Sequence, residues 1–475
     1  MRKTKIVCTL GPASADEKTM EALLTAGMNV ARFNFSHGTH EQHKKMIDTF
    51  RGVRDRLSVP AAVLLDTKGP EIRTGTVAGG NVSLVTGNPF LLTTEDIAGN
   101  DKAVGISYAD LPAQLSAGDR LLIDDGKIAL QAESCTEREI HCVIVAGGIL
   151  GDRKSVNVPK VALDMEYLSP QDKSDLLFGI QNDVDFVAAS FVRRAADIIA
   201  MRKFIDYHGG HSIRIIAKIE NIEGVDNFDE ILRHADGIMV ARGDMGVEVE
   251  FERLPGLQKR FIRRCYQSGK MVITATQMLE TMITNPYPTR AEITDVANAV
   301  FDGTSAVMLS GESAMGKHPA LAVTVMARIA EQAEFDAFTI DTYNRFDYEM
   351  SKSTTNAICD AACTTARDIQ AKAIIAVTKS GQTARLMSKF RPGIPIVAAT
   401  PEGKTYQQLS LSWGVYPVLA RYQSTSDGLF RHAIDCARQI DLVTDGDLVV
   451  IAVGIPLNTS GNTNTIRVQK VGEFF

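Results

Sequence analysis

The chain has 475 residues and a formal net charge of −6, because 57 Asp and Glu outnumber 51 Lys and Arg. This mild negative balance argues against broad nucleic-acid and anionic-membrane binding, which need a basic excess. The length exceeds one ordinary core and predicts two or three domains. Seven cysteines without a CxxC pair predict reduced thiols. We find no signal-peptide core and no apolar run of about 18 residues, so we expect a cytoplasmic protein.

Short apolar, β-branched runs recur along the chain, and amphipathic segments of helical period separate nearly all of them. The runs are Ile6–Leu10, Asn29–Phe35, Ala61–Asp66, Phe186–Phe191, Ile213–Ile219, Gly237–Ala241, Met271–Thr276 and Ala306–Ser310. The helical segments include Asp16–Ala26, Pro170–Asn182, Asn227–His234 and Pro319–Glu334. This repeated strand–helix alternation predicts an α/β protein with a TIM (β/α)₈ barrel.

The alternation is interrupted between the third and fourth runs. The interval is rich in Gly and contains short alternating runs at Val82–Val85, Phe90–Thr93, Arg120–Ile123 and His141–Val145. These predict a small all-β domain inserted where barrel loops carry catalytic groups. A further α/β unit follows, with a helix at Lys352–Ile369 and strands at Ala373–Thr378, Ile394–Thr400 and Leu448–Gly454. The predicted domains are a barrel in two parts (1–73 and 162–345), an inserted β-barrel lid (74–161) and a C-terminal α/β domain (346–475).

Polar side chains occupy the ends of several predicted strands. Residues two apart on a strand share a face, so Arg32, Asn34 and Ser36 point the same way. Burying polar groups inside a barrel costs free energy unless they bond to each other or to a ligand. These residues therefore form either a buried polar network or a binding site. Lys218 and Glu220 also share one face. They form either a buried ion pair or a cation for phosphoryl charge beside a metal carboxylate.

The sixth run ends in a charged turn that contains Gly243 and Asp244. Glycine lets the backbone approach a ligand closely, and the free N–H groups of a following helical turn hold carboxylates or phosphates. Asp244 together with Glu220 suits Mg²⁺ or Mn²⁺ rather than Zn²⁺. The alternative is an ordinary solvent-exposed turn.

Weaker signals stand at the remaining strand ends. The third run leads into Asp66-Thr67-Lys68-Gly69-Pro70-Glu71-Ile72-Arg73, the seventh ends at Thr276, and the eighth at Ser310-Gly311-Glu312. Because all of these residues lie at strand ends, each is a stronger candidate for the site than it would be alone. Cations from Arg32, Arg73 and Lys218 beside the carboxylates of Asp66, Glu220 and Asp244 fit a phosphorylated acid held by a metal. The chain has no GxxxxGK[ST] motif and is therefore not a P-loop enzyme.

These strings, in this order, closely resemble the pyruvate kinase family along the whole chain. The strings are Thr4–Pro12, Asn29–Gly38, Leu65–Arg73, Ile273–Leu279, Pro288–Glu292, Asp295–Asn298 and Ser310–Glu312. The resemblance implies a barrel with a β lid after the third strand and a C-terminal regulatory domain, usually in a homotetramer. It implies phosphoryl transfer from phosphoenolpyruvate to ADP, giving pyruvate and ATP in the final step of glycolysis.

The resemblance also implies residue roles. It assigns Lys218 to the phosphoryl group in transit, and Glu220 and Asp244 to Mg²⁺. The implied catalytic set is Lys218, Arg32, Arg73, Thr276, Ser310 and Glu312, with the proton donor to the enolate left open. The implied substrate contacts are Arg32, Lys218, Thr276 and the main-chain N–H groups of Gly243 and Asp244. The implied K⁺ ligands are Asn34, Ser36, Asp66 and the Thr67 carbonyl. The implied nucleotide contacts are Asn34, His37, Arg73 and Lys154.

Three positions refine the resemblance. Glu71 resembles the potassium-dependent members, in which no Lys supplies the charge itself, so we expect K⁺ activation. Ser155 and Lys160 stand where members usually have Gly. We expect Lys154 to reach nucleotide phosphate on lid closure, with a stiffer hinge. We also expect no appended phosphohistidine-type domain after Thr463-Asn464-Thr465.

A second predicted site lies in the C-terminal domain, where a strand runs into a helix at Thr378-Lys379-Ser380-Gly381-Gln382-Thr383. Hydroxyls, a Lys and helix N–H groups form either a phosphate cradle or a capped helix. The resemblance favours an activating sugar phosphate with Ser460–Thr463 as the closing loop. Fructose 1,6-bisphosphate, another sugar phosphate and AMP stay open as effectors.

Two other functions compete with a kinase. One is another Mg²⁺–enolate barrel, such as a pyruvate-releasing aldolase, which would not need Lys218, Arg73 or the lid. The other is a metabolite sensor that keeps the fold but has lost catalytic groups. Every position named above is filled, which favours the kinase.

Overall fold

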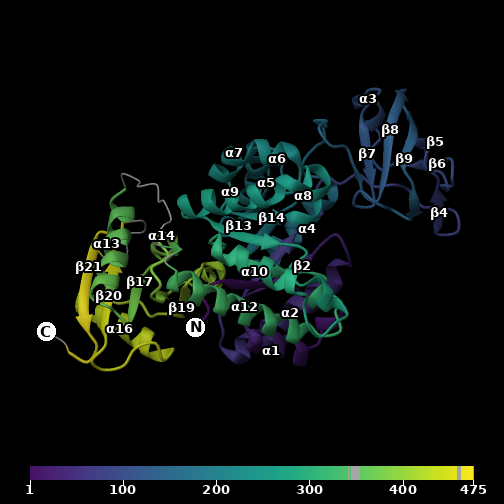
Figure 1. Ribbon diagram of the computed structural model, residues 1–475. Helices are drawn as coiled ribbons and strands as arrows, with labels where there is room; N and C mark the ends of the chain where they lie inside the picture. Colours follow the sequence, from purple (N-terminus) through teal and green to yellow (C-terminus); the bar gives the residue numbers. More distant parts are fainter. Residues whose placement is uncertain (341, 344–352, 457–461, 474–475) are drawn as a thin grey trace.

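The computed structural model describes residues 1–340, 342–343, 353–456 and 462–473. Its centre is a closed parallel barrel in the order β1-β2-β3-β12-β13-β14-β15-β16, with β16 beside β1 (Figure 1). The strands are β1 (Lys5–Thr9), β2 (Val30–Asn34), β3 (Ala62–Asp66), β12 (Phe186–Ala189), β13 (Arg214–Ile219), β14 (Gly237–Ala241), β15 (Met271–Ala275) and β16 (Ala306–Leu309). Each overlaps one predicted run, and the predicted barrel is confirmed.

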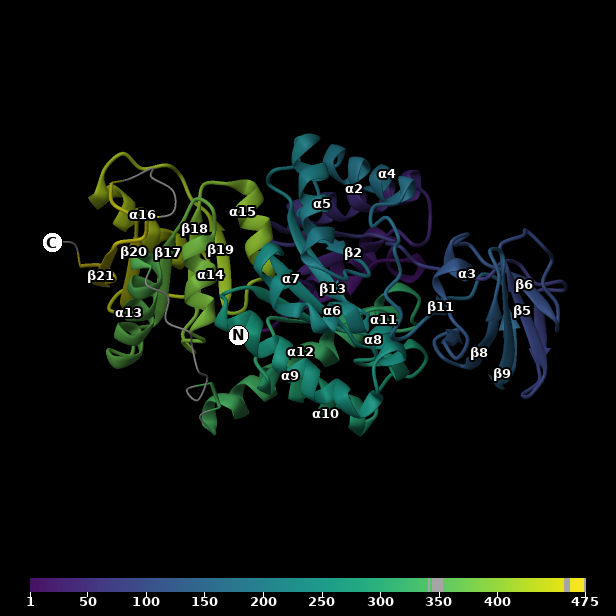
Figure 2. The ribbon, with the colours of Figure 1, turned by 90° about the horizontal axis from the view of Figure 1, so that it is seen from above.

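Helices surround the barrel strands (Figure 2). They are α1 (Glu17–Ala26), α2 (His40–Leu57), α4 (Pro170–Gln181), α5 (Ala195–Tyr207), α6 (Ile222–Asp226), α7 (Phe228–His234), α8 (Arg242–Glu248), α9 (Leu254–Gln267), α10 (Arg290–Phe301), α11 (Gly311–Ala314) and α12 (Pro319–Thr339). Helix starts follow local sequence, since the side chains of Thr39, Ser169 and Thr289 cap α2, α4 and α10. None of the helices in the described part of the chain combines the length and apolar character needed to cross a membrane.

Strand alternation divides the barrel core into two layers. Ala31 and Phe33 belong to the cluster packed between strands and helices, while Val30, Leu64 and Ile216 belong to a second cluster. The second set lies on the strand faces that point into the barrel. Residues two positions further along continue this inner face at the carboxyl ends of the strands. The inner face therefore changes from apolar to charged at the end where barrel loops carry function.

The inserted segment forms separate sheets at one end of the molecule (Figure 1). One sheet has the order β11-β7-β8-β9-β5-β6, and β4 pairs with β10. The strands are β4 (Asn81–Leu84), β5 (Pro89–Thr93), β6 (Ala103–Gly105), β7 (Arg120–Ile123), β8 (Ile128–Cys135), β9 (Glu139–Ala146), β10 (Gly148–Gly151) and β11 (Val156–Asn157), with a short helix, α3 (Leu111–Gln114). These sheets, hereafter the lid, have their own apolar core. The predicted boundaries at 73/74 and 161/162 stay predictions.

The C-terminal segment forms a sheet in the order β19-β18-β17-β20-β21 at the other end of the barrel (Figures 1 and 2). Its strands are β17 (Ala373–Val377), β18 (Ile396–Thr400), β19 (Val415–Leu419), β20 (Leu448–Val453) and the antiparallel β21 (Thr465–Lys470). Helices α13 (Thr354–Asp368) and α14 (Gln382–Lys389) cover one face, and α16 (Ser426–Gln439) covers the other. Helix α15 (Gly403–Gln408) faces the barrel. The predicted boundary at 345/346 falls on residues outside those described.

Candidate active site

Buried charges at the ends of β2, β3 and β13 form one network inside the barrel. Asp66 accepts from both neighbours: Arg32 Nε lies 2.6 Å from its Oδ2, and Lys218 Nζ lies 3.1 Å from its Oδ1. Lys218 Nζ also lies 2.9 Å from Glu220 Oε1. Arg32 donates a further bond to Thr9 Oγ1 at 2.8 Å. Lys218 and Glu220, predicted to share a strand face, are in direct contact, and Arg32 joins them through Asp66. Strand β2 ends at Asn34, so Ser36 lies beyond the strand on which it was predicted to share the face of Arg32.

Two residues that sequence reasoning missed complete this network. Ser190 follows β12, and its hydroxyl accepts a hydrogen bond from Lys218 Nζ at 2.7 Å and donates one to the Thr67 carbonyl at 2.6 Å. The Phe191 N–H donates to Glu220 Oε2 at 2.6 Å from a backbone with φ of 52°. Both residues lie in a predicted strand run whose sequence shows only a single Ser among apolar residues.

The network shifts the pKa values of its members in opposite directions. Burial opposes charge on Asp66, but Arg32 and Lys218 outweigh it and lower the Asp66 pKa. Burial likewise opposes charge on Lys218, yet the carboxylates of Asp66 and Glu220 raise its pKa. Lys218 therefore stays a cation across physiological pH. Burial raises the pKa of Glu220 to about 7 despite the opposing effect of Lys218.

The donor set at Glu220 and Asp244 fits a hard divalent cation. Burial raises the pKa of Asp244, and the ammonium of Lys218 opposes this shift. The carboxylates of Asp125 and Glu71 raise the pKa further. A cation bound between these carboxyl groups would stabilise their charged forms and so lower their raised pKa values. Within the described residues, no group of three or more His, Cys, Asp or Glu side chains could hold a metal alone. A metal here would need oxygens from substrate and water, which suits Mg²⁺ or Mn²⁺.

The predicted substrate contacts Thr276 and Gly243 are bonded to each other. The Gly243 N–H donates to Thr276 Oγ1 at 2.8 Å, and that hydroxyl donates to the Ala275 carbonyl at 2.6 Å. Thr276 has a φ of 69°, which L residues rarely adopt. The arrangement places the end of β15 directly beside the start of α8.

Glu312 joins two neighbouring loops rather than the Lys218 network. Its Oε1 accepts from the Leu279 N–H at 3.1 Å, and its Oε2 accepts from the Ser310 N–H at 2.7 Å. Burial raises the Glu312 pKa, although these two N–H donors oppose the shift. Ser310 is the N-cap residue of α11. Both residues lie after β16, where the sequence placed them.

Two of the predicted K⁺ ligands, Asn34 and Asp66, lie on neighbouring strands, and Ser36 and Thr67 follow the ends of these strands. Asn34 and Asp66 are paired in the register of β2 and β3, and the Phe35 N–H donates to the Asp66 carbonyl at 2.9 Å. Asn34 Oδ1 accepts from the Ser36 N–H at 3.1 Å. Thr67 follows Asp66 directly. The assignment of K⁺ to these oxygens stays a prediction, as does nucleotide binding at Asn34 and the exposed His37.

The lid cations are paired within and beside the lid. Arg73 Nε bonds Glu71 Oε2 at 2.8 Å, and its NH1 donates to the Arg153 carbonyl at 2.8 Å. Lys154 Nζ lies 2.9 Å from Asp124 Oδ1 in the turn between β7 and β8. These pairs hold Arg73 and Lys154 near the lid hinge, and the structure does not bring them into the Lys218 network.

The lid meets the barrel over a cavity of about 100 Å³. Its lining includes Glu71 and Ser155 from the hinge, and Phe191, Asn221 and Asp244 from the barrel. The Asn157 amide crosses the junction and donates to Glu248 Oε1 in α8 at 3.0 Å. A ligand in this cavity would contact both the lid and Asp244, one of the two proposed metal carboxylates.

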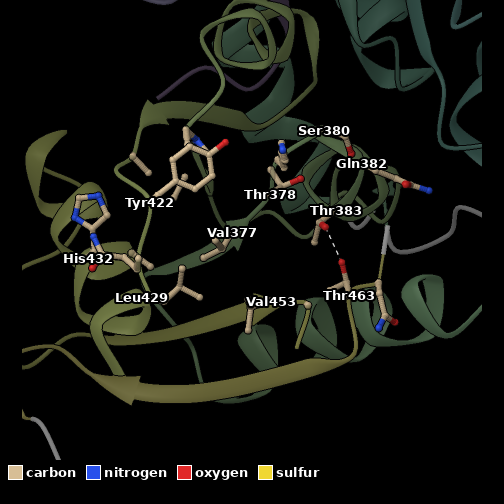
Figure 3. Close-up of a pocket in the computed structure, with 18 of the residues that line it drawn as sticks. Val377, Thr378, Ser380, Gln382, Thr383, Tyr422, Leu429, His432, Val453 and Thr463 are labelled. Atoms are coloured by element: carbon tan, nitrogen blue, oxygen red, sulfur yellow. Dashed lines mark hydrogen bonds between the residues drawn. The ribbon is translucent and has the colours of Figure 1, made fainter. Parts of the chain in front are cut away.

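A second cavity, of about 110 Å³, lies in the C-terminal sheet at the predicted effector loop (Figure 3). Thr378, Ser380, Gln382 and Thr383 line it, and the Thr383 and Thr463 hydroxyls are 2.7 Å apart. Gly381 has a φ of 79° and donates its N–H to Thr378 Oγ1 at 3.0 Å, which shapes the turn into α14. Lys379 Nζ lies 3.8 Å from Glu402. Of the predicted closing loop, Ser460 and Gly461 lie outside the described residues.

The fold and the barrel site define an α/β-barrel enzyme with buried cations and carboxylates gathered at the strand ends. The chain belongs to the pyruvate kinase family: the family's barrel-domain model matches residues 1–323, and its alpha/beta-domain model matches residues 356–469. It is 46% identical to a pyruvate kinase of Clostridium acetobutylicum, over 99% of this chain and all of the relative. It is 46% identical to a pyruvate kinase of Staphylococcus haemolyticus and 45% identical to one of Sporosarcina psychrophila, over 100% of this chain and 81% of each relative. The family predicted from the sequence is confirmed.

Proposed function

We propose that the barrel site transfers the phosphoryl group of phosphoenolpyruvate to ADP, giving pyruvate and ATP. The observation that carries this proposal is the Lys218 ammonium, held by Asp66, Ser190 and Glu220 at the strand ends. A fixed buried cation stabilises the charge that develops on a phosphoryl group in transit. Because the pKa of Lys218 is raised, this cation persists at neutral pH.

The other site residues have matching roles in this proposal. Glu220 and Asp244 would hold Mg²⁺, which when bound neutralises phosphoryl and enolate charge. Thr276 and the N–H groups of Gly243 and Asp244 would hold the substrate carboxylate, and Arg32 would orient the phosphoryl group. Ser310 and Glu312 would order the loops beside the enolate carbon. Lys154 and Arg73 would contact the nucleotide, together with Asn34 and His37.

The test is a lactate-dehydrogenase-coupled assay with phosphoenolpyruvate, ADP, Mg²⁺ and K⁺. Lys218→Met should reduce turnover by about a thousandfold while retaining much of the substrate binding. Lys173→Met is the matched control, because Lys173 forms only a surface pair with Glu166. Near-normal turnover in Lys218→Met would remove this lysine from the mechanism.

We also propose that Asn34, Ser36, Asp66 and the Thr67 carbonyl hold K⁺. The adjacent positions of Asn34 and Asp66 support this. Residue 71 is a glutamate paired with Arg73, so this position supplies no positive charge that could replace the ion. Wild-type turnover should fall sharply when K⁺ is replaced by tetramethylammonium, and Glu71→Lys should lose part of that dependence. Equal wild-type rates in both buffers would contradict the proposal.

A phosphorylated effector is proposed to bind at Thr378–Thr383 in an enzyme that assembles as a homotetramer. The cavity beside this loop and its hydroxyls support the effector site. Fructose 1,6-bisphosphate, ribose 5-phosphate and AMP should be titrated separately against the phosphoenolpyruvate saturation curve. Lys379→Ala should weaken the response, with Lys372→Ala as the control. Absence of any response would refute the effector site, and light scattering tests the tetramer.

A further inference from the structure

Arg242 connects the two elements that carry the proposed substrate cradle. It is the first residue of α8 and directly precedes Gly243, and its side chain is 12% exposed. Its guanidinium reaches the loop that follows β15. There Nε donates to the Ala275 carbonyl at 3.2 Å, and NH2 donates to the Thr276 carbonyl at 2.6 Å and the Gln277 carbonyl at 3.3 Å.

The loop that Arg242 contacts has a strained backbone. Thr276 and Gln277 have φ values of 69° and 54°, and neither is a glycine. A left-handed conformation is unfavourable for an L residue, and a β-branched Thr tolerates it less readily than Asn or Asp does. Such a conformation persists only where neighbouring groups hold it. Consecutive carbonyls bonded to one rigid guanidinium provide that restraint.

The side of the guanidinium away from the loop is also held by hydrogen bonds. Its NH1 donates to Asp295 in α10 at 2.7 Å and to Gln258 in α9 at 3.3 Å. A planar guanidinium with donors on several edges can hold carbonyls on one side and a carboxylate on the other, which a Lys ammonium cannot reproduce. The orientation of Arg242 is therefore set by the helices around the barrel.

We propose that Arg242 is a positioning residue that fixes Thr276 against Gly243. Restraint of the Thr276 carbonyl keeps the Thr276 Oγ1 within 2.8 Å of the Gly243 nitrogen, so the two groups stay adjacent at the strand ends. The inference rests on the proposed function, in which these two groups hold the substrate carboxylate. Arg242 acts through them, and its own donors are directed to the loop and the helices.

The test compares Arg242→Lys and Arg242→Gln in the full-length chain. Both should raise the KM for phosphoenolpyruvate by about tenfold or more, while the KM for ADP changes less than about twofold. Oxalate, a carboxylate probe, should bind about tenfold more weakly by calorimetry in Mg²⁺ and K⁺. A loss of turnover with unchanged KM for phosphoenolpyruvate and unchanged oxalate affinity would overturn the proposal.

Two further variants separate this proposal from the proposed function. Arg202→Lys is the fold control, because Arg202 also bonds a carbonyl and carboxylates, but at the amino end of β13. Thr276→Ala tests the cradle itself. If Thr276→Ala weakens oxalate binding and the Arg242 variants do not, the positioning role is wrong. If none of them weakens it, the carboxylate assignment fails and the positioning role with it. Should Arg242→Gln not fold, Arg242→Lys decides.

Discussion

Charged residues inside the barrel continue the same strand faces as its apolar filling. Val30 precedes Arg32 by two positions, Leu64 precedes Asp66, and Ile216 precedes Lys218. A buried charge is tolerated only when it is paired and hydrogen-bonded, and each charge here has such partners. The parity of strand residues predicted that Lys218 and Glu220 share one face, whereas Asp66, which links them to Arg32, was indicated only by its place at a strand end.

Residues whose partners are distant in sequence could not be predicted in this way. Ser190 contacts Thr67 across 123 positions, and nothing near Ser190 in the sequence indicates the bond. Arg242 was visible as a charge in a turn, but its carbonyl partners lie 33 to 35 positions away. Every residue has a backbone carbonyl, so a side chain that bonds to carbonyls cannot be recognised from the residue types of its partners.

Lys5 offers a pH-dependent test of buried charge outside the site. It is 4% exposed, donates to the Val415 carbonyl at 2.7 Å and lies 4.7 Å from the Tyr416 ring. Burial, and then Arg2, lower its pKa from 10.5 to about 7, although Glu334 opposes this. Between these values the unfolded chain binds more protons than the folded one, so stability rises with pH. The cost of the charge is fully present below pH 7.

Lys5→Met removes this titration, so its effect on stability should depend on pH. Relative to wild type, its apparent Tm should be more favourable near about pH 6 than near about pH 9.5. Thermal melts at both pH values measure the difference. Lys45→Met, an exposed lysine, should show no such dependence. An equal Tm difference at both pH values would contradict the pKa argument for Lys5.

At the scale of elements, α15 contacts both the C-terminal cavity and the barrel strands. Thr405 donates to the Lys379 carbonyl at 2.9 Å in the proposed effector loop. Gln408 donates to the carbonyls of Asp185 at 3.1 Å and Ser212 at 2.7 Å, and accepts from Arg214 Nε at 3.1 Å. These barrel residues stand at the amino ends of β12 and β13, whose other ends lead to Ser190 and carry Lys218.

Gln408→Ala should weaken the attachment of the C-terminal sheet to the barrel. It leaves buried carbonyls and a guanidinium without this partner, at about 1–3 kcal/mol for each orphaned group. The apparent Tm should fall by several degrees, and the ratio of effector-activated to unactivated rate should fall as well. Gln439→Ala, an exposed site at the end of α16, is the matched control. Unchanged Tm and activation would rule out this role for α15.

The lid segment after Pro159 carries a backbone conformation that suits glycine. Lys160 has a φ of 71°. Lys160→Gly should leave the Tm unchanged or slightly raised, since relief of roughly 1–2 kcal/mol of strain offsets the entropy lost by glycine. Lys160→Val should lower it, because a β-branched residue tolerates positive φ poorly.

Lys102→Gly is the control for the Lys160 variants, because Lys102 lies in an exposed lid turn without positive φ. It should lose about 0.5–1 kcal/mol to the entropy of the unfolded chain. Thermal melts of all three variants give the comparison. A Lys160→Gly variant destabilised as much as Lys102→Gly would show that the φ at residue 160 stores no strain.

Strand prediction succeeded for the apolar, buried barrel strands and was incomplete in the lid, where β8 was missed, and in the C-terminal sheet. Strand β14 was predicted with its observed bounds, Gly237–Ala241. Strand β19 was missed because Pro417 interrupts it, and proline is tolerated there because β19 is an edge strand. Strand β21 (Thr465–Lys470) pairs on one side only and is largely polar, so its sequence lacks an apolar run.

In the whole molecule, the lid and the C-terminal sheet lie at opposite ends of the barrel (Figure 2). The C-terminal sheet contacts the amino ends of the strands through α15, and the lid lies beyond the carboxyl ends (Figure 2), where the charges lie. The proposed effector site would therefore reach the barrel at the amino ends of its strands, whereas the lid contacts α8, which carries Asp244, through Asn157 and Glu248.

The connection between the lid and the barrel is narrow enough to test the lid by deletion. The entering and leaving chains lie side by side: the Thr74 N–H donates to the Lys154 carbonyl at 2.8 Å, and Arg73 bridges Ser155 in antiparallel register. Replacing residues 75–153 by Gly-Gly should close this pair as a tight hairpin. The lid core is separate from the barrel core, so the barrel should stay folded.

This lid-deleted variant should keep the substrate-side site and lose the nucleotide side. Trp413, buried against Tyr343 and Phe338 where the C-terminal segment meets the barrel helices, should keep its emission maximum, and oxalate should bind within a few-fold of wild type. Phosphoryl transfer should fall by about a hundredfold or more, because Lys154 loses Asp124 and the nucleotide is no longer oriented. Full-length Lys154→Met separates loss of this cation from loss of the lid. Retained transfer in the deletion variant would show that the barrel alone orients the nucleotide.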